Sequence, residues 1–364
     1  MALTAMLLAG DVMTGRGIDQ ILPHPSDPVL YEGYLTSAAD YVRIAERANG
    51  PIPRGAGFDY VWGDALDLLA GPAPVLVNLE TAVTRSDLHW PKGINYRMHP
   101  DNLPVLAAAG IDCCTLANNH VLDWGERGLL ETLDVLAAAG IATAGAGRDA
   151  TEAAAPAVLE LAGGGRLLVH AASRPSSGVP AEWAAGEERP GVAFLPDGRP
   201  AETARLAARI AAGKRPGDIV VCSLHWGPNW GYGIDPTDRR LAHQLIEAGA
   251  DVVCGHSSHH PKAAEVHRGK LVVYGCGDFL NDYEGIGTER GLRSDLSLLW
   301  MPVVDSADGS LAGLEMVPFR IRNFRLAAAD STEAAALHQV MDRECRRFGR
   351  GVALTDGRLR LELA

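Results

Sequence analysis

Side chains that commonly bind metal ions collect at the ends of short apolar runs in this sequence. Four of the twelve histidines lie there, together with two carboxylates and an asparagine. The set comprises Asp11, Glu80, Asn119, His120, His225, His256 and His259. One such histidine alone is usually a satisfied core or surface residue, but the full set in one setting indicates a metal centre. Oxygen and imidazole ligands without sulfur suit Mn²⁺, Fe or Zn²⁺.

The two carboxylates differ in what they could do. Glu80 follows the apolar run in VNLETAV, and a carboxylate there can bridge two cations about 3.5–4 Å apart. Its alternative is a charge at a helix N-terminus. Asp11 begins the block DVMTGRG, and a lone aspartate after a strand can also cap a turn. Arg16 in the same block is a candidate phosphate clamp, and a structural ion pair is an equally weighted alternative.

The block ANNHVLDWG at residues 117–125 is the most distinctive in the chain. Asn119 offers a neutral carbonyl oxygen as a ligand. His120 beside it can protonate a leaving oxygen, because the ordinary pKa of histidine is near 6.5. Asp123 can orient that imidazole, and its alternative is a cap for the helix expected after residue 125.

Two further blocks supply imidazoles, HWG at 225–227 and GHSSHHP at 255–261. The spacing of three between His256 and His259 lets both face one site from a turn, and glycine allows a close backbone approach. We interpret His260 as a loop residue. Asp278 in GCGDFLND closes another apolar run, where it could orient a histidine ligand.

The elements that must position these residues are short buried strands alternating with amphipathic helices. Continuous apolar runs predict strands buried on both faces. They lie at residues 5–9, 75–77, 113–117, 219–224, 252–254 and 271–274. Helices are expected over 103–109, over 128–139 before Gly140, and over 237–248 with Thr237 as the cap. This alternation predicts an α/β fold with its ligands at the carboxyl ends of the strands.

Three regions depart from that alternation. Residues 23–60 are rich in proline, glycine and tyrosine, contain a helix pattern near 35–48, and are interpreted as an insertion or lid. Residues 173–200 form a long proline- and glycine-rich loop. The last third has hairpin character over 264–274, and over 296–320 around Asp308 and Gly309.

The overall composition limits the classes of molecule that the protein could bind. The chain has 33 basic and 45 acidic residues, a net charge of −12. This charge argues against generic binding to nucleic acid or anionic lipid, and it allows a small phosphorylated or polyanionic substrate. No membrane anchor or signal peptide is expected, and the six cysteines are interpreted as buried and reduced. These features predict a cytoplasmic protein, with a homodimer left open.

Seven blocks in order resemble the CapA-like family, the poly-γ-glutamate capsule synthesis group within the calcineurin-like metallophosphoesterases. They are GDVMTGR, NLETAVT, LANNHVLDWGERGLLETLDVL, GAGRDATEA, HWGPNWG, GHSSHHP and YGCGDFLND. The resemblance implies a four-layer α/β/β/α sandwich over residues 1–325, interrupted by the insertion at 23–60. Residues 326–364 are expected to be a helical and strand extension packed on the same domain.

The resemblance also implies a role for each site residue. Asp11 and His259 would bind the first of two divalent cations, Glu80 would bridge both, and His120 would be the general acid. The ligands of the second cation would be Asn119, His225 and His256. The wider superfamily has a histidine where this chain has Met13, which leaves the first site one protein ligand short.

The function expected from these residues is hydrolysis of a phosphoric ester. A metal-bound hydroxide would attack phosphorus, Arg16 would stabilise charge, and His120 would protonate the leaving group. Two alternatives stay open. The chain could be a non-catalytic component of poly-γ-glutamate or envelope polymer synthesis, or its metals could act on an amide bond.

Overall fold

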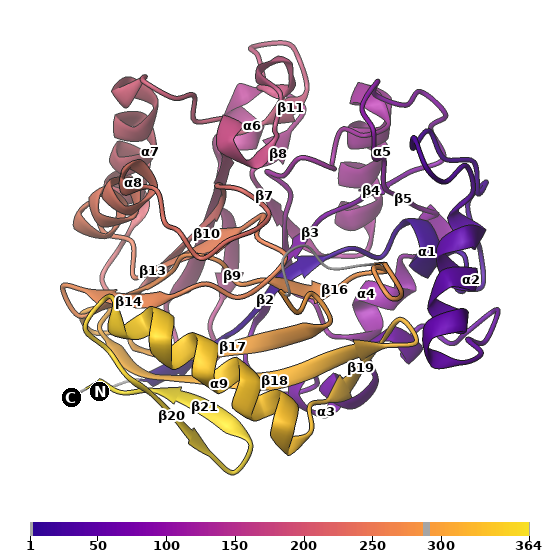
Figure 1. Cartoon of the computed structure of the whole chain (residues 1–364). Helices are drawn as coiled ribbons and strands as arrows, with labels where there is room; N and C mark the ends of the chain where they lie inside the picture. Colours follow the sequence, from indigo (N-terminus) through magenta and orange to yellow (C-terminus); the bar gives the residue numbers. More distant parts are fainter. Residues whose placement is uncertain (1–2, 287–291, 364) are drawn as a thin grey trace.

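Two β-sheets packed face to face form the centre of the molecule in the computed structural model, which describes residues 3–286 and 292–363 (Figure 1). The larger sheet runs in the order β20-β21-β18-β17-β2-β3-β6-β7, and β1, β16 and β19 pair with β17, β2 and β18. Its strands are β1 (Leu3–Ala5), β2 (Leu7–Val12), β3 (Val75–Leu79), β6 (Cys113–Thr115), β7 (Ala142–Ala144), β16 (Asp278–Leu280), β17 (Leu296–Asp305), β18 (Leu311–Arg322), β19 (Arg325–Ala328), β20 (Val352–Thr355) and β21 (Arg358–Leu361).

The smaller sheet runs in the order β14-β15-β13-β12-β10-β9. Its strands are β9 (Ala157–Glu160), β10 (Arg166–Ser173), β12 (Ile219–His225), β13 (Val252–His256), β14 (Ala264–His267) and β15 (Lys270–Val273). A hydrogen bond of 3.1 Å between the hydroxyls of Ser223 and Thr115 joins the facing sheets. Two short pairs lie outside both sheets: β4 (Ala82–Val83) with β5 (Arg97–Met98), and β8 (Ala146–Gly147) with β11 (Gly191–Val192).

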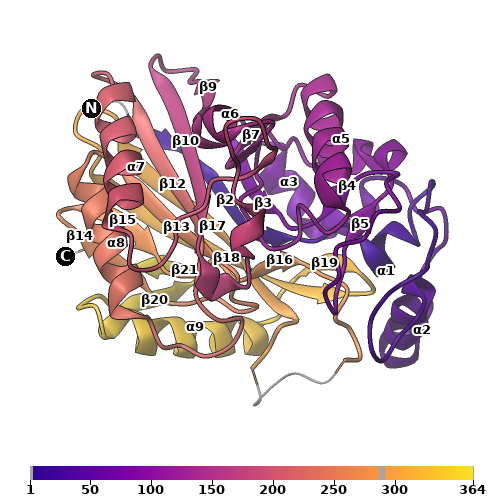
Figure 2. The same cartoon turned by 90° about the horizontal axis from the view of Figure 1, so that it is seen from above.

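Helices cover the outer faces and complete four layers, which confirms the predicted α/β/β/α sandwich (Figure 2). On the smaller sheet these are α7 (Pro200–Gly213) and α8 (Pro236–Glu247), and on the larger sheet α3 (Leu66–Leu69), α4 (Pro104–Ala108) and α5 (Gly125–Ala138). The remaining helices are α1 (Arg16–Asp19), α2 (Ala38–Asn49), α6 (Ala150–Ala154) and α9 (Ser331–Arg346). Single 3-10 turns occur at Tyr60–Ala65, Pro100–Asn102, Pro175–Ser177 and Ala181–Trp183.

The central strands explain the continuous apolar runs in the sequence. Every residue of β2, β3, β12 and β13 is buried, because each of these strands has parallel neighbours in its sheet and another layer on each face. The two expected hairpins are present as β14–β15 and β17–β18. All six cysteines are buried and free, as the sequence indicated.

Helix ends agree with the sequence at some points and correct it at another. Gly140, which follows Ala139 at the C-cap of α5, has φ +73°, as expected for a residue that ends a helix in the left-handed region. The expectation that Thr237 caps the next helix is wrong, because α8 begins one residue earlier and its N-cap is Asp235. The Asp235 carboxylate accepts a hydrogen bond from the Thr237 amide.

The insertion and the C-terminal extension that were expected from the sequence both lie around the sandwich. Residues 23–60 carry α2, which packs against α1. Residues 329–363 contain α9 and the β20–β21 hairpin, and these contact β18 of the larger sheet (Figure 1). Among the residues that the structure describes, no helix has the length and hydropathy needed to cross a membrane.

Candidate metal centre

The carboxyl ends of parallel strands from both sheets meet at one site. In the larger sheet Asp11 on β2 pairs in register with Asn78 on β3 and with Asp278 on β16. In the smaller sheet His225 on β12 pairs with His256 on β13. The polar ends of five strands are therefore level with one another, at the sheet edge where α/β folds bind ligands.

Three buried carboxylates converge at this edge. Asp11, Glu80 and Asp278 are each at most 4% exposed, and each offers an oxygen within 4.8 Å of the others. Within the described residues their only ion-pair partners are histidines. Burial raises the pKa of Glu80 well above its usual range, and the charges of Asp11 and Asp278 raise it further. A divalent cation would offset this concentration of negative charge.

A second group of ligand atoms lies beside Glu80. The Nε2 atom of His225 is 3.1 Å from Oδ1 of Asn119 and 3.9 Å from Oε1 of Glu80. One imidazole nitrogen and two oxygens thus lie close together, contributed by the end of β12 and by the loops after β3 and β6. His225 and Asn119 are two of the three residues predicted for the second site.

His256 joins the two groups. Its Nδ1 atom lies 3.2 Å from Oδ1 of Asp11, in a contact without hydrogen-bond geometry. The Nδ1 atoms of His225 and His256 are both buried without a hydrogen-bond partner. Buried polar atoms normally have partners, so the unpartnered Nδ1 of His256, which faces Asp11, fits a site that is completed by a bound metal ion.

The position of Asp11 is fixed by its neighbours. Its Oδ1 accepts a hydrogen bond of 2.7 Å from the Asn78 amide, and its Oδ2 accepts one of 3.0 Å from the backbone amide of Ser257. Ser257 has φ +91°, which is unusual for a residue with a side chain. Backbone strain of this kind clusters at functional sites, and here it aims an amide at a candidate ligand.

For His259 the geometry favours a role other than the predicted metal ligand. Its Nδ1 lies 3.0 Å from Oδ1 of Asp278, and its Nε2 lies 3.0 Å from the side-chain nitrogen of Asn229. Both ring nitrogens therefore have protein partners. Asp278, which the sequence suggested as an orienting residue, is the member of this pair that belongs to the carboxylate cluster.

His120 lies at the edge of the centre in a polar chain. Its Nδ1 is 2.7 Å from Oδ2 of Asp123, and its Nε2 is 3.8 Å from Oε1 of Glu80. The ring of Tyr96 stacks on it at a centroid distance of 3.8 Å. Burial lowers the pKa of His120 to about 4, with a further contribution from Lys92. Asp123 thus lies where the sequence predicted an orienting carboxylate.

Lys92 is a cation that sequence reasoning missed. Its ammonium is 2.6 Å from Oδ1 of Asp123 and 3.3 Å from Nδ1 of His120, and it donates to the backbone carbonyl of Asn119. It lies in the loop between β4 and β5, outside every block singled out in the sequence. Nothing in the spacing links a loop lysine to a histidine 28 residues further along the chain.

Arg16 is held by carboxylates on its inner side. Its guanidinium donates two hydrogen bonds to Asp282, of 2.9 and 2.5 Å, and one of 2.9 Å to Glu32. It also contacts the hydroxyl of Tyr41, and it is only 3% exposed. This geometry favours the ion-pair alternative over the phosphate clamp.

A pocket of about 370 Å³ opens over the candidate centre. Glu80, Asn119, His120 and His259 form its polar floor. Its walls combine aromatic and aliphatic side chains with polar ones: Arg16, Tyr34, Lys92, Ile94, Tyr96, Gly178, Asn229, Trp230, Tyr283, Ile286 and Ser294. A small ligand with an anionic head and an apolar body fits this distribution.

The chain is similar to proteins of bacterial capsule synthesis. A probable polyglutamine synthesis accessory protein of Mycobacterium tuberculosis is 48% identical over 348 residues, which are 94% of this chain and 92% of that protein. The PGA biosynthesis protein CapA of Bacillus subtilis is 27% identical over 75% of this chain and 62% of its own.

Two solved structures are more distant. A 5'-nucleotidase precursor of Thermus thermophilus has a TM-score of 0.48 at 16% identity, covering 93% of this chain and 59% of that one. A phosphatase of Mycoplasma pneumoniae has a TM-score of 0.47 at 13% identity, covering 92% and 97%.

The family model described as bacterial capsule synthesis protein PGA_cap matches residues 5–283. This match covers all seven blocks that carry the resemblance found in the sequence, and it confirms that resemblance. The chain belongs to the bacterial capsule synthesis protein PGA_cap family.

Proposed function

We propose that this protein is a metal-dependent phosphoric ester hydrolase with two divalent cations at the candidate centre. The observation that carries the proposal is the meeting of three buried carboxylates that have no lysine or arginine ion partner in the described ranges. Buried carboxylates without a cation are costly, so a resident dication explains their arrangement better than a structural role.

Each cation would have its own protein ligands. Asp11 and Asp278 would hold the first, and Asn119 and His225 the second, with Glu80 between them. His256, which contacts Asp11, would complete the set. A ligand set of carboxylates, imidazoles and one amide suits Mn²⁺, Fe or Zn²⁺.

Bound divalent cations would activate water for attack and neutralise charge that develops on phosphoryl oxygens. The residues of the chain would do the rest. His120 points its Nε2 toward Glu80 and the pocket, where a leaving oxygen would lie. Asp123 fixes the ring through Nδ1. Burial and the charge of Lys92 lower the pKa of His120, and an anionic substrate beside the ring would raise this pKa, because a nearby negative charge favours the protonated form.

Lys92 would orient the substrate. Its ammonium lines the pocket next to His120, and it is the only lysine among the pocket-lining residues that the structure describes. Lys92 would have the role of phosphate clamp that was predicted for Arg16. A cation there would attract a phosphate or carboxylate group without forming the fork that arginine provides.

The second candidate function is a non-catalytic or amide-acting part in making a glutamate polymer. The mycobacterial relative is described as a polyglutamine synthesis accessory protein, and the Bacillus relative as a PGA biosynthesis protein. The pocket would then hold a carboxylate of the polymer, and turnover of phosphate esters would be absent.

Elemental analysis of gently purified protein, combined with turnover of p-nitrophenyl phosphate, tests the proposal. We expect about two equivalents of Mn, Fe or Zn and metal-dependent turnover in the parent protein, both lost in Asn119→Ala and His256→Ala. His24→Ala, a change of an exposed histidine outside the pocket, is the matched control and should keep both. Absence of bound metal after adding Mn²⁺ or Zn²⁺ would overturn the metal centre. Bound metal with polyglutamate binding and no ester hydrolysis would favour the second function.

A further inference from the structure

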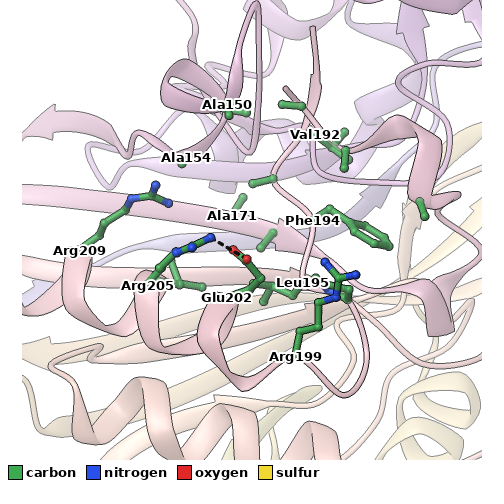
Figure 3. Close-up of a pocket in the computed structure, with 18 of the residues that line it drawn as sticks. Ala150, Ala154, Ala171, Val192, Phe194, Leu195, Arg199, Glu202, Arg205 and Arg209 are labelled. Carbon is green, nitrogen blue, oxygen red and sulfur yellow. Dashed lines mark hydrogen bonds and ion pairs between the residues drawn. The ribbon is translucent and has the colours of Figure 1, made fainter. Parts of the chain in front are cut away.

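A second cavity, of about 660 Å³, lies away from the candidate metal centre. It is bounded by α6, by α7 and by the segment over residues 181–197 (Figure 3). None of the candidate metal ligands lines it. It is larger than the pocket over the metal centre and falls in the volume range of small-molecule binding sites.

The inner walls of this cavity are built largely from alanine. Ala150 and Ala154 come from α6, Ala172 from the end of β10, and Ala181 and Ala184 from the segment that follows. Alanine ends at Cβ, so these elements come together without filling the space between them. The side chains of Val192, Phe194 and Leu195 add apolar surface on another side (Figure 3).

The α7 side of the cavity carries three arginines, Arg199, Arg205 and Arg209 (Figure 3). Arg205 pairs with Glu202 at 2.7 Å. The other carboxylate of the lining, Asp197, pairs with Arg174 outside the cavity at 2.5 Å. Neither Arg199 nor Arg209 has a carboxylate partner in the part of the chain that the structure describes. In a protein of net charge −12, two such guanidiniums at one cavity indicate an anionic ligand.

We propose that this cavity binds a small amphipathic anion. Its apolar body would lie among the alanines and Phe194, and its carboxylate or phosphate head would pair with Arg209, at the end of the cavity opposite Arg199 (Figure 3). Arginine suits both head groups because its planar fork pairs with two oxygens at once. The proposal does not depend on the function of the metal centre.

One turn, over residues 181–184, connects the cavity to the pocket over the metal centre. Ala181 and Ala184 face the cavity, while Trp183 between them packs edge-to-face on Trp90 at 5.7 Å. The ammonium of Lys92 lies 5.2 Å from the centroid of the Trp183 ring. An occupant of the cavity would therefore contact a turn that supports a residue of the neighbouring pocket.

Titration of the full-length protein with 1-anilinonaphthalene-8-sulfonate, an aryl ring system with one anionic group, tests the site by fluorescence. We expect one saturable site that survives treatment with a chelator and the His256→Ala change. Arg209→Ser should weaken binding at least tenfold, and so should Ala154→Trp, which places a large ring in the cavity from a partly exposed helix position. Arg215→Ser removes an exposed arginine outside the cavity and should leave affinity unchanged.

Competition against the bound probe then identifies the head group. Decanoate and decylphosphonate should displace it at least tenfold better than decanol, and the better of the two anions names the preferred head. Equal affinity in the parent protein, Arg209→Ser and Ala154→Trp would overturn the proposal. Displacement by decanol that equals displacement by the two anions would also overturn it. Loss of probe binding in His256→Ala would do the same, because it would place the probe over the metal centre.

Discussion

Asp278 offers the carboxylate that we propose for the first cation, where Met13 stands in place of the superfamily's histidine. Met13, two residues after Asp11, is only 2% exposed and donates its backbone amide to the carbonyl of Leu280. That hydrogen bond helps to hold β16 alongside β2, and the pairing brings Asp278 level with Asp11. The apolar side chain therefore belongs to the core, while the neighbouring strand supplies a carboxylate.

Replacing Asp278 by asparagine should remove one cation from the centre. An amide is neutral and a weaker ligand, so we expect about one metal equivalent after dialysis in place of two, measured by elemental analysis. His259→Gln should keep two equivalents at saturation but loosen them about 10–100-fold, as expected for a residue that orients a ligand. Asp308→Asn, at an exposed turn, is the matched control. If Asp278→Asn kept both metal equivalents and His259→Gln lost one, His259 would be the metal ligand, as the sequence predicted.

Replacing Arg16 tests whether this residue stabilises the fold or acts on the substrate. Replacement by glutamine would leave Asp282 and Glu32 buried without their cation, because both side chains are inaccessible to solvent. We expect a loss of about 3–5 kcal/mol in the free energy of unfolding, measured with urea, while bound metal and turnover per folded molecule stay near the parent values. Unchanged stability with abolished turnover would identify Arg16 as the phosphate clamp.

At the scale of elements, the sequence predicted where the strands lie better than it predicted which strands pair in each sheet. Runs such as Ile219–Leu224 indicated buried strands because β12 is covered on both faces, and the polar residue that follows each run marked the functional edge. The order of strands in the two sheets could not be read in this way. It depends on pairings such as β17 with β2, which join residues almost 300 positions apart.

The same limit applies to the site. Side chains at strand ends were predicted because their position follows from the periodicity of one segment. Lys92 and Glu32 come from loops, and their contacts with His120 and Arg16 depend on how those loops fold across the strand ends. The exchange of roles that we propose for Asp278 and His259 could not be read from the sequence for the same reason, since it rests on the place of β16 beside β2.

The outer face of β10 contains a buried histidine that should make the protein sensitive to acid. His170 is 3% exposed and neither ring nitrogen has a hydrogen-bond partner. Burial lowers its pKa to about 4, with a contribution from Arg209 on α7. Because the folded state resists protonation, the stabilising contribution is complete above the unfolded pKa near 6.5 and is lost as pH falls toward 4.

The His170→Leu variant, which cannot be protonated at this position, measures that contribution. Between pH 7 and pH 4 the free energy of unfolding of the parent protein should fall by up to roughly 3 kcal/mol more than that of the variant. Other buried histidines titrate in both proteins, so only the difference between the two urea unfolding series counts. Parallel pH profiles would show that His170 finds a partner or solvent when protonated.

On the scale of the whole molecule, the candidate centre joins the two sheets. Asp11, Glu80, Asn119 and Asp278 come from strands of the larger sheet or the turns after them. His225 and His256 end strands of the smaller sheet. Besides side-chain packing, the described residues join the sheets through polar pairs such as Ser223 with Thr115. Cations held by ligands from both sheets would add a further link between the two halves of the sandwich.

Removal of the metal should consequently lower the stability of the entire fold. A ligand that binds only the native state stabilises it by about 4 kcal/mol when present at 1,000 times its Kd, and two cations would contribute separately. We expect a chelator to reduce the midpoint of thermal unfolding by several degrees in one cooperative transition, and added Mn²⁺ or Zn²⁺ to restore it. His225→Ala should start from the lower midpoint and respond less to both treatments, while His24→Ala should behave as the parent does. A chelator effect of equal size in His225→Ala would place the stabilising metal elsewhere in the molecule, and two separate transitions after chelation would show that the sheets unfold independently without it.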